Sequence, residues 1–456
     1  MIHTRREFLA TAGRASATAT IAAPALGVLG ALHVRADEVP RIDAARLRAD
    51  IEALSVFGRP PGGTFADGVS RTAYSDADVA GRRFVMDLLR EAGLTPRIDA
   101  AGNIFAQRAG REAALPPILF GSHIDSVPEG GNFDGALGSL AGIEAVRTLN
   151  RRGTTTRHPL EVVVWAHEEG GTFPNGLNGS RVAAGRLIEG DLEHVYKGLK
   201  KADGIRRIGG DPDRLADARR APGSFHCYLE LHIEQGATLD RKRLPIGVVE
   251  GIVAISRYEA RVRGFANHAG TTAMPDRQDA LVAASQLVLA VREIVTSEEG
   301  RQVGTVGRLD VSPNATNVVP GEVVAAIELR DLSADKLVRL GKAIEDRAAR
   351  IARDTNTTIA VKPVGGYAGA DATPGVQAAI ERAAESLGLE CLRMPSGAGH
   401  DAQMMATLGP MGMIFVPSIG GVSHSPKELT TWEDCANGAD VLLRSVLEVD
   451  AMAELK

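Results

Sequence analysis

Hydrophobic positions follow two different spacings along most of the chain, and together they predict alternating helices and strands. Spacings of three and four residues predict amphipathic helices over 76–92 and 135–149. Uninterrupted apolar runs typical of buried parallel strands occur at 118–120, 160–165 and 227–231. This succession predicts an α/β fold with a central mixed sheet flanked by helices. In such sheets ligand sites form at the carboxyl ends of the strands.

The pattern changes after about residue 247, where alternating strands are separated by two long helical stretches. The order β-α-β-β-α-β matches the split βαβ arrangement of a small α+β domain. An α/β pattern resumes near residue 372, so this small domain is predicted to interrupt the larger one. The expected strands are 252–263, 303–311, 323–329 and 358–364, and the expected helices are 279–295 and 334–353. We therefore expect a large domain of residues 37–247 and 365–456, with an inserted domain of residues 248–364.

The first 36 residues are predicted to be a separate export segment. Thr4-Arg5-Arg6-Glu7-Phe8-Leu9 resembles a twin-arginine motif, and an Ala-rich apolar stretch over 18–32 follows it. Val34-Arg35-Ala36 fits a small-residue cleavage rule. The apolar stretch is broken by proline and glycine and is too short for stable membrane association. We expect cleavage after Ala36 and a periplasmic location. A disordered N-terminal tail is the alternative.

Composition narrows the classes of partner and of metal site. The 456-residue chain carries a net charge of −5 and no long basic run, so nucleic acid is not an expected partner. Its three cysteines, Cys227, Cys391 and Cys435, show no CxxC spacing. They therefore predict neither a disulfide framework nor a thiolate metal site.

Five short segments supply histidines and carboxylates at or near predicted strand ends. Imidazole and carboxylate without thiolate suit Zn²⁺, Mn²⁺, Co²⁺ or Ni²⁺. Five ligands are too many for one four-coordinate ion but suit two divalent ions that share a bridging carboxylate. A remaining carboxylate could then handle the proton of a nucleophilic water. These residues predict a metallohydrolase, and they are His123 with Asp125, Asp134, Glu168 with Glu169, His232 and His424.

Each segment also has a plainer interpretation when it is taken alone. Asp125 follows His123 by two residues and is a candidate to accept the second N–H of that imidazole, which would fix its tautomer. Asp134 lies in a Gly-rich segment, but no lysine follows at the spacing of a phosphate-binding loop. Glu168 and Glu169 are adjacent at a strand end, so one carboxylate is expected to face the site and the other to point away from it. Taken alone, the pair could instead be a solvated acidic turn. The combination favours the metal site.

The order and spacing of these segments resemble the M20 family of metallopeptidases and amidohydrolases. The resemblance is closer to its hydantoinase/carbamoylase branch, which contains N-carbamoyl-L-amino acid hydrolases, β-ureidopropionases and allantoate amidohydrolases. It extends from about Arg41 to the C-terminus. The matching segments are Gly121-Ser-His-Ile-Asp-Ser126, Gly130-Gly-Asn-Phe-Asp-Gly135, Asn178-Gly-Ser-Arg181, Leu231-His-Ile-Glu-Gln-Gly236, Asn267-His-Ala-Gly-Thr-Thr272, Pro313-Asn-Ala-Thr-Asn-Val-Val-Pro-Gly321, Gly397-Ala-Gly-His-Asp401 and Ser423-His-Ser-Pro426.

The resemblance implies a role for each of these residues. His123, Asp134 and His232 would hold one ion, while Asp134, Glu169 and His424 would hold the second. Glu168 would be the general base for a water between the ions, and His268 would stabilise the oxyanion in the site of a partner subunit. The inserted domain would act as a lid and as the contact of a homodimer. The residues expected to bind substrate are Gln235, Asn317, Arg330, Gly399 and His400.

The activity implied by the resemblance is hydrolysis of the carbamoyl (ureido) C–N bond of N-carbamoyl-L-amino acids or related ureido acids. Arg330 is expected to clamp the substrate carboxylate, because guanidinium offers a bidentate fork; an ion pair with Asp331 is the alternative. Other activities left open are allantoate or ureidoglycolate amidohydrolysis, a dipeptidase or aminoacylase, and a periplasmic binding protein with a dead site. One departure from the family pattern is Gly170-Gly171-Thr172-Phe173, where many members carry an arginine before the phenylalanine.

Overall fold

Residues 40–455 are described by the computed structural model of the chain. The predicted export segment, residues 1–36, lies outside the described residues. The described residues belong to the second of the two units into which the chain divides, Pro40–Lys456.

A nine-stranded mixed sheet forms the centre of the larger domain. Its middle strands β4, β3, β7 and β17 are parallel to one another, so their carboxyl ends meet at one edge. The strands in sheet order are β1 (Pro96–Ile98), β2 (Ile104–Arg108), β4 (Leu160–Trp165), β3 (Ile118–His123), β7 (Cys227–Ile233), β17 (Met411–Val416), β8 (Ile246–Ile252) and β15 (Ala370–Asp371), and β16 (Cys391–Ser396) also pairs with β8.

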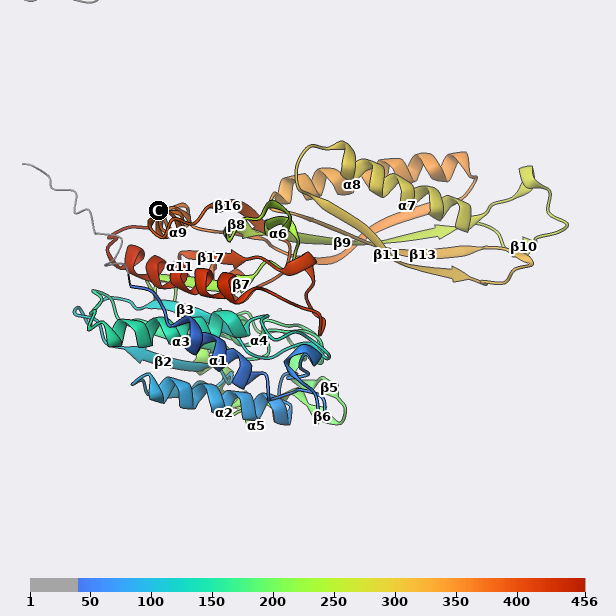
Figure 1. The fold of residues 1–456 in the computed structure, drawn as a ribbon. Helices are drawn as coiled ribbons and strands as arrows, with labels where there is room; N and C mark the ends of the chain where they lie inside the picture. The colour runs from blue at the N-terminus through green and yellow to red at the C-terminus, as the bar shows by residue number, and fades with distance from the viewer. Residues whose placement is uncertain (1–39, 456) are drawn as a thin grey trace, which may run out of the picture. The chain divides into compact units, whose positions relative to one another are not determined.

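Helices cover both faces of this sheet (Figure 1). On one face lie α2 (Asp76–Glu91), α3 (Ala136–Arg151), α9 (Pro374–Ser386) and α11 (Trp432–Asp450), and α1 (Ala44–Leu54) packs on α3 and α11. The short helices α4 (Asn178–Ala183) and α10 (Asp401–Met405) pack on the other face. The remaining short elements are α5 (Lys201–Arg207), α6 (Thr238–Lys242), β5 (Val195–Tyr196) and β6 (Leu199–Lys200).

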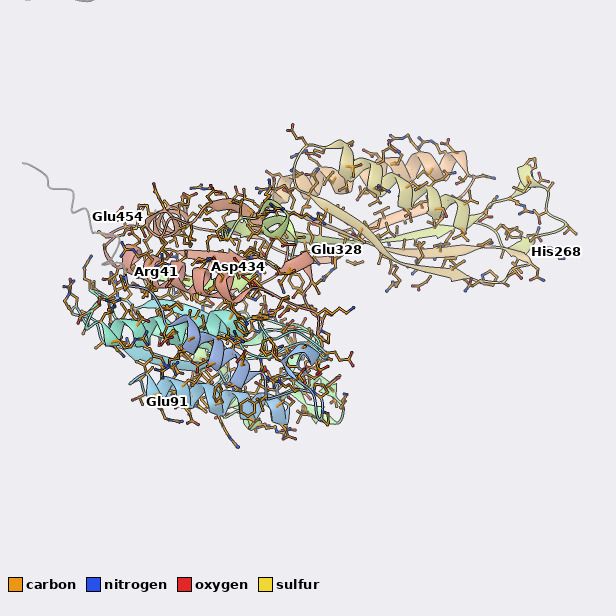
Figure 2. All side chains as sticks on the ribbon, viewed as in Figure 1. Arg41, Glu91, His268, Glu328, Asp434 and Glu454 are labelled. Atoms are coloured by element: carbon orange, nitrogen blue, oxygen red, sulfur yellow. The ribbon has the colours of Figure 1, made fainter. Side chains whose placement is uncertain are left out.

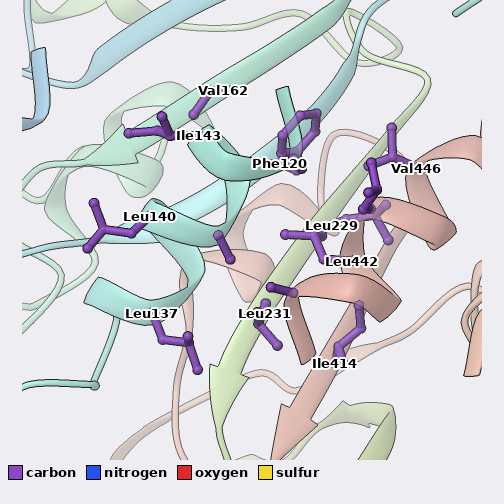
Figure 3. Packing of buried hydrophobic residues seen from close by; sticks show 14 of the residues in the cluster. Phe120, Leu137, Leu140, Ile143, Val162, Leu229, Leu231, Ile414, Leu442 and Val446 are labelled. Carbon is purple, nitrogen blue, oxygen red and sulfur yellow. The ribbon is translucent and has the colours of Figure 1, made fainter. Parts of the chain in front are cut away.

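The close fit of α3 on the sheet explains its small residues. All but the last two residues of this helix are buried, and Leu137 and Leu140 belong to the same apolar cluster as Leu231 and Leu442 (Figure 3). A Cβ added at Gly138 would lie 2.1 Å from the main-chain oxygen of Leu231. Only glycine therefore permits the approach that brings the start of α3 to the edge where β3 and β7 end.

The smaller domain is a four-stranded antiparallel sheet in the order β11-β13-β9-β14, with two helices on one face (Figure 1). Buried and partly exposed side chains alternate along β13, as period-two strands with one covered face require. Helix α7 is long and apolar enough to span a membrane by composition, yet it is 44% buried and packs into this core. The elements are β9 (Ala254–Arg263), α7 (Ala280–Ser297), β11 (Val303–Ser312), β13 (Glu322–Asp331), α8 (Ala334–Asp354) and β14 (Thr358–Tyr367).

The predicted fold class is confirmed, and most element boundaries differ from the expected ones by one to three residues. The order β-α-β-β-α-β is also observed in the small domain. One difference concerns the strand expected over 227–231, which continues to Ile233 and so includes His232. A second is an additional two-stranded ribbon, β10 (Asn267–His268) with β12 (Val318–Val319), where no strand was expected.

Candidate metal centre

Four of the five predicted ligand segments lie where the sheet brings strand ends to one edge. His123 is the last residue of β3, and His232 is the penultimate residue of β7. Glu168 and Glu169 lie in the loop that follows β4, and His424 lies in the loop that follows β17. The parallel order β4, β3, β7, β17 places these loops side by side, as expected for the carboxyl edge of an α/β sheet.

Asp134 approaches the two histidines because Gly135 follows it. Gly135 has a φ of 64° and forms the N-cap of α3. A Cβ at this position would lie 2.3 Å from Cε1 of His123. The glycine is therefore needed twice, once for its left-handed backbone and once for the space that the imidazole occupies.

Asp134 offers one carboxylate oxygen to each of two ligand groups. Its Oδ1 lies 3.5 Å from Nε2 of His123 and 3.1 Å from Nε2 of His232. Its Oδ2 lies 3.4 Å from Nε2 of His424, which in turn lies 3.5 Å from Oε1 of Glu169. These two groups are the sets predicted from the sequence, and Asp134 occupies the bridging position between them.

The buried histidines direct their Nε2 atoms toward Asp134. Nδ1 of His123 lies 3.0 Å from the main-chain oxygen of Asp125, and Nδ1 of His232 lies 2.9 Å from that of Ile233. A carbonyl oxygen only accepts, so each Nδ1 carries a hydrogen and each Nε2 is the nitrogen that can bind a metal ion. The amide of Gly135 also donates to Nε2 of His232 at 3.2 Å. This tautomer is the one that metal-ligating histidines adopt.

The spacing of these atoms fits divalent cations. Two ligand atoms about 2.0–2.1 Å from one tetrahedral ion are separated by about 3.3 Å. The separations of 3.1–3.5 Å around Asp134 match this value. Oε1 of Glu169 is buried and has no hydrogen-bond partner among the described residues. An unpartnered buried carboxylate oxygen in a set of nitrogen and oxygen donors fits a metal ion.

The cluster contains several carboxylates that lie close to one another and to the histidines, and these neighbours shift their pKa values. Burial and the neighbouring Asp134 raise the pKa of Glu169 to about 8. Burial, Glu169 and Asp401 raise the pKa of Glu168 well above its usual range. Burial would also raise the pKa of Asp134, but His232, His123 and His424 hold it well below its usual range. Bound cations would stabilise the ionised form of every one of these groups.

Asp125 has a different role from the one expected. Its carboxylate does not accept from His123, because the two side chains are 3.9 Å apart and the main-chain oxygen of Asp125 takes that hydrogen bond. The carboxylate instead accepts the amides of Glu168 at 3.2 Å and Glu169 at 3.1 Å. Asp125 therefore holds the loop that carries both glutamates.

Glu168 and Glu169 both face the site, although one was expected to point away from it. Both line the same cavity. Oε2 of Glu168 lies 3.7 Å from Nε2 of His123, whereas Glu169 belongs to the group around His424. The loop turns sharply here, since His167 has a φ of 52°, so the alternation of a strand does not apply. Glu168 is left as the carboxylate beside the two ligand groups.

Glu428 and Ser423 support Asp134 and were not singled out from the sequence. Oε1 of Glu428 accepts the amides of Phe133 at 2.9 Å and Asp134 at 3.1 Å. The Ser423 hydroxyl lies within hydrogen-bond distance of both Asp134 (3.1 Å) and Glu428 (2.9 Å). Ser423 and Glu428 lie close to His424 in the sequence, and this proximity was the only sequence signal that could have indicated them.

A third group of potential ligands, Glu230, His232 and His400, is already satisfied by hydrogen bonds. Glu230 accepts from the Ser122 hydroxyl at 2.7 Å and from the Ala402 amide at 2.9 Å. Nε2 of His400 lies 2.9 Å from the Ser396 hydroxyl. His400 stacks edge-on against His232 with ring centroids 4.5 Å apart, so it supports that ligand from behind.

A cavity of about 320 Å³ opens on both ligand groups. It is lined by metal-site residues on one side and by the small domain on the other, where Arg330 and Ile255 reach it. Of the residues expected to bind substrate, the cavity includes Gln235, Arg330, Gly399 and His400. Nε2 of Gln235 donates to Oδ2 of Asp134 at 2.7 Å, so this amide contacts the bridging carboxylate. Lining residues not expected from the sequence include Leu177, Arg181, Val253, Ile255, Tyr367 and Gln403.

Arg330 is paired, but not with Asp331. Its Nε donates to Oε1 of Glu328 at 2.8 Å, while Asp331 pairs with Lys336 at 3.2 Å. Adjacent residues on a strand point to opposite faces, which is why Asp331 cannot reach the guanidinium. Nη1 of Arg330 also donates to the main-chain oxygen of Gly397 at 2.6 Å.

His268 and Asn317 lie together, but they do not line this cavity. His268 is exposed on β10, at the end of the small domain away from the large sheet (Figure 2). The main-chain oxygen of Asn317 accepts the Ala269 amide at 2.9 Å beside it. Nδ1 of His268 accepts the amides of Gly270 and Thr271, so its Nε2 carries the hydrogen and can donate.

Two histidine–carboxylate groups at the carboxyl edge of a mixed α/β sheet define a metal-dependent hydrolase. The chain belongs to peptidase family M20/M25/M40, which matches residues 119–448. Within that family, relatives named as amidohydrolases align over most of this chain.

The chain is 41% identical to the N-carbamoyl-L-amino acid amidohydrolase of Geobacillus stearothermophilus, over 90% of this chain and 99% of that relative. It is 38% identical to the ureidoglycolate hydrolase of Arabidopsis thaliana, over 88% of this chain and 85% of that relative. The crystal structure of an amidase of the hydantoinase/carbamoylase family from Burkholderia multivorans has a TM-score of 0.83 at 37% identity. It covers 91% of this chain and 99% of the other.

Proposed function

We propose that this protein hydrolyses the ureido C–N bond of N-carbamoyl-L-amino acids, giving the amino acid, ammonia and carbon dioxide. The observation that carries the proposal is a single cavity that joins both ligand groups, Glu168 and the guanidinium of Arg330. A ureido acid has a carbonyl carbon for attack and a carboxylate for the arginine. The relative from Geobacillus stearothermophilus, named for this reaction, supports the assignment.

Two divalent ions would be held by His123, Asp134 and His232, and by Asp134, Glu169 and His424. When bound, such ions polarise a carbonyl and lower the pKa of water. We leave Zn²⁺, Mn²⁺, Co²⁺ and Ni²⁺ as candidates, because nitrogen and oxygen donors suit each of them.

Glu168 would accept the proton of the attacking water and return it to the leaving nitrogen. It lies beside His123 but belongs to neither ligand group, so its carboxylate is free to carry a proton. Burial, with Glu169 and Asp401 nearby, raises the pKa of Glu168, which makes its carboxylate a stronger proton acceptor. Arg330 and the backbone near Gly399 would hold the substrate carboxylate, since both line the cavity.

His268 would complete the site of a second copy of the chain. Its Nε2 carries a hydrogen and is exposed, as a donor to a developing oxyanion must be. Because His268 does not line the cavity of its own chain, we propose a homodimer formed through the small domain. Light scattering would test it, and a monomer with full activity would contradict it.

Ureidoglycolate or allantoate hydrolysis is the second candidate. These substrates also combine a ureido group with a carboxylate, and the relatives from Arabidopsis thaliana and Oryza sativa are named ureidoglycolate hydrolases. Ammonia release by purified, Mn²⁺- or Zn²⁺-loaded protein separates the candidates. The panel contains N-carbamoyl-L-amino acids, N-carbamoyl-β-alanine, allantoate, ureidoglycolate and dipeptides, each with a chelated control. Cleavage of dipeptides alone would overturn the proposal.

We also propose that the folded protein is exported through its Arg5-Arg6 segment, which supports a periplasmic location. Fractionation of cells that express the full chain tests this. Replacement of both arginines by lysine should leave the protein in the cytoplasm, and an unchanged distribution would contradict export by this route.

A further inference from the structure

The guanidinium of Arg330 is held on two sides in this structure. Its Nε and Nη2 contact Oε1 of Glu328 at 2.8 and 2.7 Å, and its Nη1 donates to the Gly397 oxygen at 2.6 Å. Guanidinium has five N–H groups. Three are used by these contacts, which leaves one on each terminal nitrogen for a ligand in the cavity.

Glu328 is in turn fixed by a second arginine. Its other oxygen, Oε2, accepts from Nε of Arg257 at 2.7 Å, and Arg257 is its direct partner on β9. The Arg257 guanidinium lies 5.4 Å from the ring centre of Tyr367, which lines the cavity. Glu328 thus stands between two arginines on the uncovered face of the small sheet. Its side chain is only 29% exposed.

We propose that Glu328 is a positioning residue, which directs the tip of Arg330 toward the Gly397–Gly399 loop so that the substrate carboxylate binds end-on. The inference rests on the proposed function, because it assumes a carboxylate substrate. Glu328 occupies the side edge of the guanidinium, the edge formed by Nε and Nη2. A ligand therefore meets only the N–H groups left on Nη1 and Nη2.

Removing the Glu328 charge has two opposing effects on a carboxylate ligand. Loss of an anion near the cavity would attract the substrate more strongly and lower KM. Loss of the two contacts would free a side chain with several rotatable bonds, and ordering it again on binding would raise KM. If Glu328 positions Arg330, the cost of ordering Arg330 is the larger effect and KM rises. The sign of the change in KM therefore shows which of the two effects is larger.

The chain contains a matched control on the same strand. Glu322 also accepts from two arginines, Arg261 at 2.7 Å and Arg263 at 3.0 Å, on the same face of β13. It does not line the cavity. Glu322→Gln therefore removes a comparable ion pair from the same sheet without touching Arg330.

The experiment measures kcat and KM of the metal-loaded enzyme with N-carbamoyl-L-alanine and with its carboxamide analogue. Glu328→Gln should raise KM for the carboxylate about tenfold, as expected for a lost charge-assisted hydrogen bond. We expect kcat to stay within about twofold and KM for the carboxamide to change little. Glu328→Asp should recover part of the effect, and Glu322→Gln should match the wild type.

An unchanged or lowered KM in Glu328→Gln would overturn the proposal, as would an equal loss on the carboxamide. Failure of the wild type to hydrolyse any ureido acid would instead overturn the proposed function. In that case a crystal structure of Glu328→Ala decides the positioning role. A guanidinium displaced from the Gly397 oxygen supports it, and one that stays in place overturns it.

Discussion

The carboxylate of Asp125 accepts the main-chain amide of Glu168 at 3.2 Å, and its second oxygen accepts the next amide along the chain. This arrangement fixes the loop that carries the expected general base. Asp125→Asn keeps the size of the side chain but replaces one acceptor by an NH₂ donor that faces an amide. We expect kcat to fall by about 10- to 100-fold, the usual effect of changing a residue that orients a metal site.

Asp279→Asn provides the control for this change. Asp279 also accepts two amides, those of Leu281 and Val282, but it does so at the start of α7 in the small domain. Asparagine is as good as aspartate at a helix N-cap, so stability and kcat should both stay close to the wild type. If Asp125→Asn retained full kcat, the loop would not depend on these hydrogen bonds.

Glu168→Gln should abolish most of the turnover while the metal content stays unchanged. Glu168 is not part of either ligand group, so the amide should not disturb them. Loss of a general base typically costs about 10²- to 10⁴-fold in rate. Metal analysis with single-turnover kinetics checks both statements. Glu169→Gln is the comparison, because it should lower the metal content itself. Retained activity in Glu168→Gln would assign the base to another residue.

Gly135→Ala should disrupt the ligand group of His123. The new methyl group would lie 2.3 Å from the imidazole, and the backbone has a φ of 64°. Gly153 has the same φ and nothing within 4 Å of an added Cβ, so Gly153→Ala isolates the backbone strain. We expect Gly135→Ala to lose metal and activity, and Gly153→Ala to lose only about 1 kcal/mol of stability. Equal effects in both variants would show that the imidazole can move.

The two ligand groups were predictable because their positions follow from the architecture. Parallel strands bring their carboxyl ends together, so His123 and His232 could be grouped before any distance was known. His424 could be added only through its chemistry and the family resemblance, since nothing in its loop fixes a position. The helix and strand boundaries were predictable because periodicity marks a covered face directly.

The supporting contacts were not predictable, since they depend on loop conformation and on distant segments. The bond from the Asp134 amide to Glu428 joins residues 294 apart in the chain, which no local pattern encodes. The partner of Arg330 was predictable in principle. On a strand, i and i+2 share a face, so Glu328 was a better candidate than Asp331. The amides that donate to the Asp125 carboxylate were not predictable, because they lie in a loop turned by the positive φ of His167.

Removal of metal should lower the stability of the protein. The carboxylates of Asp125, Asp134 and Glu169 are buried in this cluster, and that of Glu168 is largely covered. Ions that bind only the folded state add about 2.7 kcal/mol at a hundredfold excess over Kd. Chelated protein should therefore unfold at a lower temperature, and added Mn²⁺ or Zn²⁺ should restore it. His123→Ala, which removes one ligand, should show a smaller response, and a response equal to the wild type would place the ion elsewhere.

A pair of stacked histidines far from the ligand groups should make stability depend on pH. The rings of His226 and His158 lie 4.1 Å apart at the ends of the strands opposite the metal site. Nε2 of His226 lies 3.2 Å from the Val449 oxygen. Burial, His158 and Arg157 lower the pKa of His226, against the opposing effects of the Val449 hydrogen bond and Asp450.

A lowered pKa means that the folded protein binds this proton less readily than the unfolded chain, whose histidine has a pKa near 6.5. The contribution to stability is therefore complete above about pH 6.5 and is lost as the pH falls through the lower, folded value. His226→Gln keeps a donor for Val449 and cannot be protonated. As the pH falls from 8 to 5, the melting temperature of this variant relative to that of the wild type should rise, because only the wild type loses the His226 contribution. A difference that stays flat for His226→Gln would show that the stacked pair accepts the proton without cost.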